Sequence, residues 1–195
     1  MKSGIKHIGE SHIFKWNEHN YIFESNKTSL KIFQSTNIKN YKPILEGLLE
    51  DFGYTYWNAI LTWCDIIDDD PRCKNKYWQV WLVEYERNVI GICGLFSHKD
   101  DNNEELWLGW FGIVPALRNK HLGEEILGWM ETEAKRLGSK RILSYVDEDG
   151  KPLSFYYRNG YKLLGSVKEY LANNRAASKE DFESLNDHVI AKEIL

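Results

Sequence analysis

The sequence IVPALRNKHLG, residues 113–123, is the strongest indication of fold in this chain. It follows a strand predicted over Leu106 to Ile113, which is rich in aromatic residues, and it opens an amphipathic helix predicted to run to about Leu137. The first turn of a helix offers backbone N–H groups that have no intrahelical acceptor, together with the positive end of the helix dipole. Arg118 and Lys120 add two charges at the same place. This order of strand, loop and helix therefore predicts a site for an anion such as a diphosphate.

The same stretch resembles the acyl-CoA-binding motif of the GNAT superfamily of N-acetyltransferases, V-x-P-x-x-[RQ]-x-x-G-x-[GA]. Ile113 takes the place of the valine, and the residues that match are Pro115, Arg118 and Gly123. His121 takes the place of the first glycine of the motif. A residue with a Cβ atom resists the torsions and the close approach that glycine allows. We expect the histidine to be tolerated if its torsions stay in the α region.

A second stretch, DGKPLSFYYRNGY at residues 149–161, resembles the family element N-x-x-A-x-x-F-Y-x-x-x-G-[FY]. Asp149 replaces the usual asparagine and Pro152 the usual alanine, and the residues that match are Phe155, Tyr156, Gly160 and Tyr161. A predicted helix and strand separate the two stretches, in the order that the family requires. In the family this second element is a short helix, and its tyrosine lies near the thiol end of coenzyme A.

The resemblance implies an α/β (α+β) fold, in which helices flank a mixed, mostly antiparallel sheet whose fourth and fifth core strands splay apart. In this chain the splayed strands are expected to be Glu105–Ile113 and Arg141–Val146. We expect residues 28–195 to form the acetyltransferase domain and residues 1–27 to form an N-terminal extension. Ser11–Trp16 and Tyr21–Ser25 are expected to pair as a hairpin within this extension.

Hydrophobic periodicity and turn residues predict the remaining elements. The predicted helices are Asn37–Leu49 and Trp57–Ile67. The predicted strands are Ser29–Gln34, Trp78–Tyr85, Val89–Phe96, Tyr161–Val167 and His188–Leu195. Leu171–Asp187 is expected to be a polar loop that could hold a short helix.

The resemblance also implies that the cofactor is acetyl-CoA, which carries the activated acyl group while the protein binds and orients it. The backbone of Trp110 to Ile113 is expected to pair with the pantetheine arm. The full set of expected cofactor-binding residues is Trp110, Phe111, Gly112, Ile113, Val114, Arg118, Asn119, Lys120, His121, Leu122, Gly123, Asp149 and Tyr156.

Tyr156 is the candidate general acid, which would protonate the leaving thiolate, unless its ring only packs against the cofactor or the core. The general base is less well defined. Many relatives carry a glutamate on the fourth strand at a position that is Gly109 here, and glycine cannot act as a base. Glu105 could act through a water molecule, although a solvated strand end also explains it, and the base could simply be water.

Aromatic residues give the only indication of the chemical class of the acceptor. Eight tryptophans are many for 195 residues, and Trp57, Trp107 and Trp110 lie in elements that would flank an acceptor site. Aromatic faces with carboxylates nearby attract a cationic amine, so a small amine is the expected acceptor. Packing in the core is the alternative explanation for at least half of the tryptophans.

Composition limits the other partners. The net charge of −4 argues against a general nucleic-acid binder. The three cysteines have no metal-site spacing, so no metal is expected, and they suit a reduced, cytoplasmic setting. No apolar run is long enough to span or anchor in a membrane, and a homodimer is left open.

Three function classes follow. The first is an N-acetyltransferase that acetylates a primary amine of a small molecule by direct attack in a ternary complex. The second is a protein acetyltransferase that acts on an N-terminus or a lysine. The third is a non-catalytic acyl-CoA-binding module of the same fold.

Overall fold

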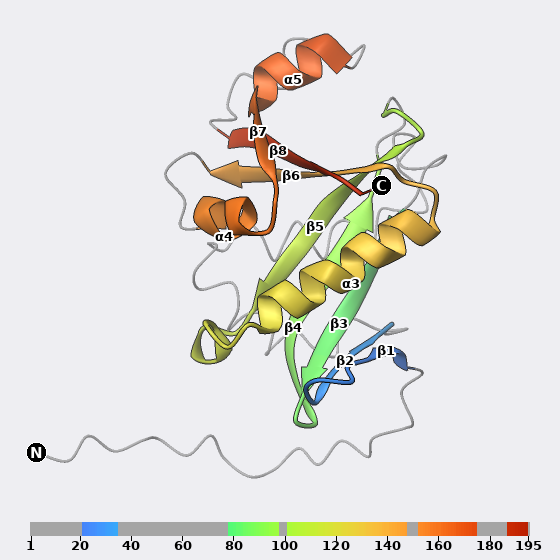
Figure 1. Ribbon diagram of the computed structural model, residues 1–195, viewed down its shortest axis with the longest axis vertical. Helices are drawn as coiled ribbons and strands as arrows, with labels where there is room; N and C mark the ends of the chain where they lie inside the picture. Colours follow the sequence, from blue (N-terminus) through green and yellow to red (C-terminus); the bar gives the residue numbers. More distant parts are fainter. Residues whose placement is uncertain (1–20, 35–77, 98–100, 148–151, 175–186, 195) are drawn as a thin grey trace, which may run out of the picture.

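The computed structural model describes residues 21–34, 78–97, 101–147, 152–174 and 187–194. Within these ranges the strands form one sheet in the order β1-β2-β3-β4-β5-β6-β8-β7 (Figure 1). The strands are β1 (Tyr21–Glu24), β2 (Leu30–Phe33), β3 (Trp78–Tyr85), β4 (Asn88–Phe96), β5 (Glu105–Ile113), β6 (Arg141–Asp147), β7 (Lys162–Ser166) and β8 (Asp187–Glu193). The helices are η2 (Pro115–Leu117), α3 (Leu122–Arg136), α4 (Pro152–Arg158) and α5 (Val167–Asn174). β5 and β6 are parallel and the other described pairs are antiparallel, which confirms the mixed, mostly antiparallel sheet.

Most predicted elements appear close to their predicted bounds. The helix after the acyl-CoA-binding motif ends at Arg136, and Gly138 follows with a φ of 88°, as a helix C-terminus favours. The β-meander of β3 and β4 turns at Glu86 and Arg87, whose φ angles are 50° and 65°. The predicted helices at 37–49 and 57–67 and the predicted strand at 11–16 lie outside the described residues.

Helix α5 begins earlier than the sequence patterns predicted. Ser166 and Glu169 form a reciprocal capping box, in which the Glu169 N–H donates to Ser166 Oγ (3.2 Å) and the Ser166 N–H donates to Glu169 Oε2 (3.2 Å). This cap ends the strand and starts the helix at Val167, where the prediction had placed the end of a strand followed by a polar loop.

The expected boundary between residues 27 and 28 falls in the connection between two strands of the same sheet. β1 pairs with β2, and the Tyr21 hydroxyl donates to the carboxylate of Glu84 on β3 at 3.0 Å. The division into extension and domain stays a prediction, and β1 is an edge strand of the sheet.

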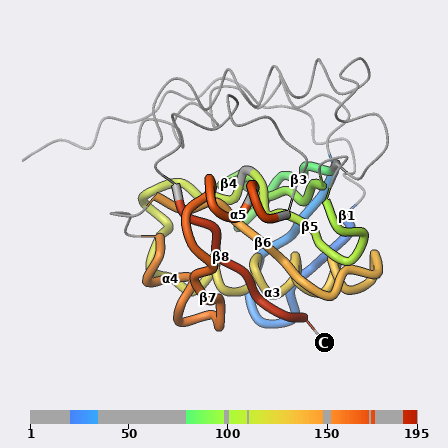
Figure 2. The backbone as a smooth tube through the Cα atoms, turned by 90° about the horizontal axis from the view of Figure 1, so that it is seen from above, coloured from blue at the N-terminus to red at the C-terminus, as the bar shows by residue number. Residues whose placement is uncertain are grey.

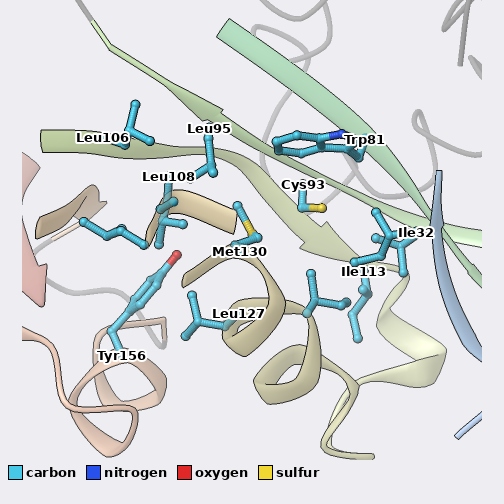
Figure 3. Packing of buried hydrophobic residues seen from close by; sticks show 14 of the residues in the cluster. Ile32, Trp81, Cys93, Leu95, Leu106, Leu108, Ile113, Leu127, Met130 and Tyr156 are labelled. Carbon is cyan, nitrogen blue, oxygen red and sulfur yellow. The ribbon is translucent and has the colours of Figure 1, made fainter. Parts of the chain in front are cut away.

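The two faces of the sheet carry separate cores. On one face, α3 and α4 pack against the strands, and Figure 3 shows Leu127, Met130 and Tyr156 turned toward Leu108 and Leu95. On the opposite face, α5 packs through Val167 and Tyr170 onto a smaller core that also contains Trp107, Leu143, Val189 and Ala191. Figure 2 shows α3 and α5 on opposite sides of the central strands.

The expected splay between β5 and β6 is present. The two strands pair only through Glu105–Arg141, Leu106–Ile142 and Trp107–Leu143. Beyond these pairs β5 continues along β4 and β6 continues along β8, so the strands diverge (Figure 1).

Irregularities in β5 and β7 shape the sheet. In β5, Trp110 and Phe111 stand opposite the single residue Cys93, because Gly109 pairs with Gly94 and Gly112 with Ile92. Such a bulge bends its strand. In β7, the extra residue is Leu164, and Gly165 follows it with a φ of 132°.

Candidate acyl-CoA site

The site begins at the open edge of β5. No ladder pair joins β5 to β6 beyond Trp107 and Leu143 in these two described strands, while residues 108–113 remain paired with β4 on the other side. The backbone N–H and C=O groups of alternate residues in this segment therefore face the gap and need other partners. The bulge at Trp110 and Phe111 lies in the middle of this open edge. The expected pairing segment, Trp110 to Ile113, therefore has the geometry to accept a further extended partner; the side chain of Trp110 lies outside the described atoms.

The loop after β5 is closed by its own backbone. Pro115 opens η2, and the N–H groups of Leu117 and Arg118 donate to the carbonyl oxygens of Val114 (3.0 Å) and Pro115 (3.1 Å). The Arg118 Nε donates to the Ile113 carbonyl oxygen at 3.2 Å, so this side chain also ties the loop to the end of β5. Arg118 thus stabilises the loop and places a positive charge next to the end of β5.

His121 is the N-cap of α3 and has φ 59° and ψ 8°, which is the left-handed region. The condition on which the histidine was expected to be tolerated, torsions in the right-handed α region, is therefore not met, and Asn119 also has a positive φ of 62°. His121 thus takes the type of conformation for which the motif uses glycine. Its side chain is 89% exposed, with Nδ1 at 3.3 Å from Glu124 Oε2.

These torsions give the backbone at the start of α3 a geometry that suits an anion. The first bond into the helix is donated by the Glu125 N–H to the His121 carbonyl oxygen (3.3 Å), and by helix geometry the N–H groups of 121–124 have no intrahelical acceptor. No side chain caps this terminus. Residues that alternate with left-handed ones turn successive N–H groups into one concavity, which favours anions. Lys120 is exposed beside it.

Gly123 lies where α3 approaches α4 and β5. A Cβ atom placed on it would lie 3.4 Å from Phe155 Cε2 and 4.0 Å from Phe111 Cζ. Those distances are ordinary contacts for one methyl group, but a larger side chain would have to displace the Phe155 ring. The glycine keeps the first turn of α3 close to α4.

Tyr156 projects from α4 into the core beside the splay. It is 7% exposed, and its ring contacts those of Phe111, Phe155 and Tyr161. Burial raises the pKa of Tyr156 to about 12, and a hydrogen bond with Ser144 opposes part of that rise. The phenol is therefore protonated at neutral pH and can give a proton, whereas the neighbouring Tyr157 is 45% exposed.

Glu105 lies at the paired end of the splay. Its carboxylate accepts from Arg141 Nη1 (3.0 Å) and from the Tyr170 hydroxyl (3.2 Å). Glu105 and Gly109 are on the same face of β5 by strand alternation, about 13 Å apart at roughly 3.3 Å per residue. Trp107 lies between them and is fully buried, so it packs the core and offers no surface to an acceptor. Trp57 and Asp149 lie outside the described residues.

Sequence reasoning missed two neighbours of the site. Ser144 lies beside the Tyr156 hydroxyl, and the alternation of β6 does place it on the same face as Ile142 and Val146. Phe96 lies over Gly109, because a Cβ atom on that glycine would be 2.9 Å from Phe96 Cδ1. Nothing in the sequence signals this second contact, which depends on the register between β4 and β5.

Comparisons with known proteins agree with this arrangement. Residues 76–163 match the family described as the acetyltransferase (GNAT) domain. No curated protein matches the chain. Among the described residues, no helix is long and apolar enough to cross a membrane.

Several solved structures share the fold. An acetyltransferase of Streptococcus agalactiae superposes with a TM-score of 0.61 at 18% identity, over 84% of this chain and 98% of that one. A GNAT family acetyltransferase of Elizabethkingia anophelis with acetyl-CoA bound gives 0.59 at 13% identity, over 87% and 99%. The PaiA N-acetyltransferase of Thermoplasma acidophilum in complex with coenzyme A gives 0.55 at 19% identity, over 85% and 99%.

Proposed function

Because residues 76–163 match the acetyltransferase (GNAT) domain and the chain shares its fold with solved acetyltransferases, we propose that it moves an acetyl group from acetyl-CoA to a primary amine of a small molecule. The amine attacks directly within a ternary complex. One observation carries the proposal: the anion site at the start of α3, the open edge of β5 and the protonated phenol of Tyr156 converge on one gap in the sheet.

The described residues fit coenzyme A in charge and shape. The concavity at residues 121–124, with Lys120 and Arg118 nearby, suits a pyrophosphate. The open backbone of Phe111 to Ile113 suits the amide groups of the pantetheine arm, which can pair with it as a strand would. Gly123 keeps α3 close enough to α4 for the two ends of the site to act on one ligand.

Tyr156 is proposed as the general acid. When the amine nitrogen bonds to the thioester carbonyl carbon, the C–S bond breaks and the phenol gives its proton to the sulfur. The nitrogen loses a proton to water, and the phenol is reprotonated from water, so charge and protons balance. Ser144 on β6 lies beside the phenol, and its hydrogen bonding opposes part of the rise in the pKa of Tyr156.

Water is proposed as the base in preference to Glu105. The Glu105 carboxylate is already paired with Arg141 and Tyr170, and its side chain is only 11% exposed. Holding the two reactants in attack geometry then supplies much of the rate.

A cytoplasmic location and a homodimer stay predictions.

The test has two stages. Acetyl-CoA should raise the melting temperature, because a ligand that binds only the native state stabilises it. Thiol release is then measured with a panel of small amines and a panel of peptides. Stabilisation with amine turnover supports the proposal, turnover of peptides alone supports the protein acetyltransferase, and stabilisation without any turnover supports the binding module.

A further inference from the structure

The C-terminal end of α4 holds Tyr156 through Tyr161. The N–H of Tyr161 donates to the Tyr156 carbonyl oxygen (3.1 Å), and the N–H of Gly160 donates to the Tyr157 carbonyl oxygen (3.1 Å). With the φ of 86° at Gly160, these bonds form a Schellman motif, in which the residue after the glycine commonly contacts the last turn of the helix. Here the ring of Tyr161 lies 5.3 Å from that of Tyr156, so the position of one ring sets the position of the other.

Lys192 on β8 covers this end of α4 and ties it to α3. Its Nζ atom lies 5.8 Å from the ring centroid of Tyr161, and its Cε atom is 3.6 Å from where a Cβ atom of Gly160 would be. The same Nζ atom pairs with Glu131 Oε2 on α3 at 2.7 Å, and the two side chains are only 28% and 17% exposed. Burial and the charge of Glu131 both raise the pKa of Tyr161. Lys192 therefore contacts α3 and the end of α4 at once.

This ion pair is a second contact between α3 and the α4 region. The first contact is at Gly123, which lies against the ring of Phe155 on α4. Gly123 and Glu131 are about 12 Å apart along α3, at 1.5 Å of helix rise per residue. Two contacts separated by this distance fix the angle of α4 to α3, whereas the contact at Gly123 alone would leave α4 free to pivot.

From these contacts, and resting on the proposed function, we infer that Lys192 and Glu131 are positioning residues, whose ion pair holds α4 at the angle that directs the Tyr156 hydroxyl to the thioester sulfur. Figure 3 shows the Tyr156 side chain reaching from α4 with its hydroxyl directed toward β5, so a tilt of α4 moves this hydroxyl relative to the gap. A displacement of about 1 Å in a reacting group can cost up to about a hundredfold in rate. A largely buried ion pair adds little net stability, because desolvation offsets its attraction, so its contacts favour a role in geometry.

The test replaces the ion pair by apolar side chains of similar size in the double variant Lys192→Met/Glu131→Leu. Its melting temperature should stay close to that of the wild type, because apolar residues can replace a buried ion pair without loss of stability. Its kcat should nevertheless fall by about tenfold, with little change in the Kd for acetyl-CoA. Glu131→Gln, which keeps the size of the side chain and removes its charge, should lower kcat in the same direction, and Lys192→Arg should keep most of the rate. Arg136→Met is the matched control, because it breaks the exposed pair of Arg136 with Glu133 on the same helix and should leave kcat unchanged.

A double-mutant cycle with Tyr156→Phe distinguishes positioning from a purely structural role. If the ion pair acts through the phenol, its replacement should lower kcat no further once the hydroxyl is absent. Equal losses of kcat with and without the hydroxyl would overturn this inference and leave the proposed function standing, as would a wild-type kcat in both Lys192→Met/Glu131→Leu and Glu131→Gln. Binding of acetyl-CoA by the wild type without turnover of any amine would overturn the proposed function, and this inference with it.

Discussion

The two faces of the splay differ in kind. The α3 face holds the proposed anion site and the phenol of Tyr156 beside Ser144, whereas the described part of the α5 face holds the stacked rings of Phe96, Trp107 and Tyr145 and the ion pair of Glu105 with Arg141. We call the α3 face, which carries the proposed anion site, the donor face, and the opposite face the acceptor face. Substitutions on the two faces should therefore change different steps of the proposed reaction.

Removing the Tyr156 hydroxyl should have the largest effect of the changes considered, and this effect should be on kcat. Tyr156→Phe keeps the ring in its core position, so packing changes little. The loss of a positioned acid should lower kcat by roughly a hundredfold or more, while the Kd for acetyl-CoA changes little. Steady-state kinetics and a binding titration separate these quantities.

Tyr157→Phe is the matched control, because Tyr157 is exposed one residue away. It should be close to wild type. Equal kcat for wild type and Tyr156→Phe, with chemistry shown to be rate-limiting, would remove the phenol from the mechanism.

The pH dependence tests the proposal that water, and no side chain, is the base. With water as the base, only the neutral amine reacts, so kcat/KM should rise about tenfold per pH unit between pH 6 and 9, well below the pKa of an alkylamine. Tyr156 must stay protonated to act as an acid. Since burial raises its pKa to about 12, it causes no fall in rate over this range.

The pH profile is measured as kcat/KM with the best amine of the panel. A plateau that begins between pH 6 and 8 would reveal a protein base, and Glu105→Gln would then tell whether Glu105 is that base.

A larger side chain at the junction of α3 and α4 should weaken the binding of acetyl-CoA. In Gly123→Val the γ-methyl groups must displace Phe155, and overpacking of this kind costs about 1–3 kcal/mol. If that cost falls on the bound state, the Kd for acetyl-CoA rises by about tenfold or more. Gly123→Ala adds only a methyl group at contact distance and should stay within a few-fold. If titration gave an unchanged Kd for the valine variant, acetyl-CoA would not bind at this junction.

The smallest effect is expected at His121. A non-glycine residue in the left-handed region costs roughly 1–2 kcal/mol, and the greater freedom of glycine in the unfolded chain offsets part of the gain. His121→Gly should therefore raise the free energy of unfolding by about 0.5–1 kcal/mol and keep acetyl-CoA affinity near wild type. Denaturant unfolding checks the first quantity, with His121→Ala as the control that keeps the strain. Loss of binding in the glycine variant would give the imidazole a role of its own.

Local signals made the donor face predictable. The order of β5, loop and α3 followed from Pro115, the helical periodicity and Gly138, and the two motifs placed α4 and its tyrosine. The start of α5 was also readable, since Ser166 and Glu169 have capping-box spacing, but the strand pattern of Lys162–Ser166 was extended past it.

The acceptor face was not predictable for a physical reason. The position of Phe96 over Gly109 and the bulge at Trp110 and Phe111 depend on how β4 and β5 are aligned. That register is set by pairing and burial across the sheet, and a shift of one residue would turn each side chain to the other face. The left-handed torsion of His121 was also not predicted, because the residue type does not require it.

The bulge in β7 has a consequence for the behaviour of the protein in solution. β7 is the last strand of the sheet, so its outer side presents main-chain groups on which another polypeptide could assemble, and Leu163 and Leu164 are 47% and 44% exposed beside them. Leu164 and Gly165 interrupt this edge after two residues, which denies an incoming strand the continuous ladder that aggregation needs. In the described sheet, the bulge thus works against edge-to-edge pairing at the place where two adjacent leucines are exposed.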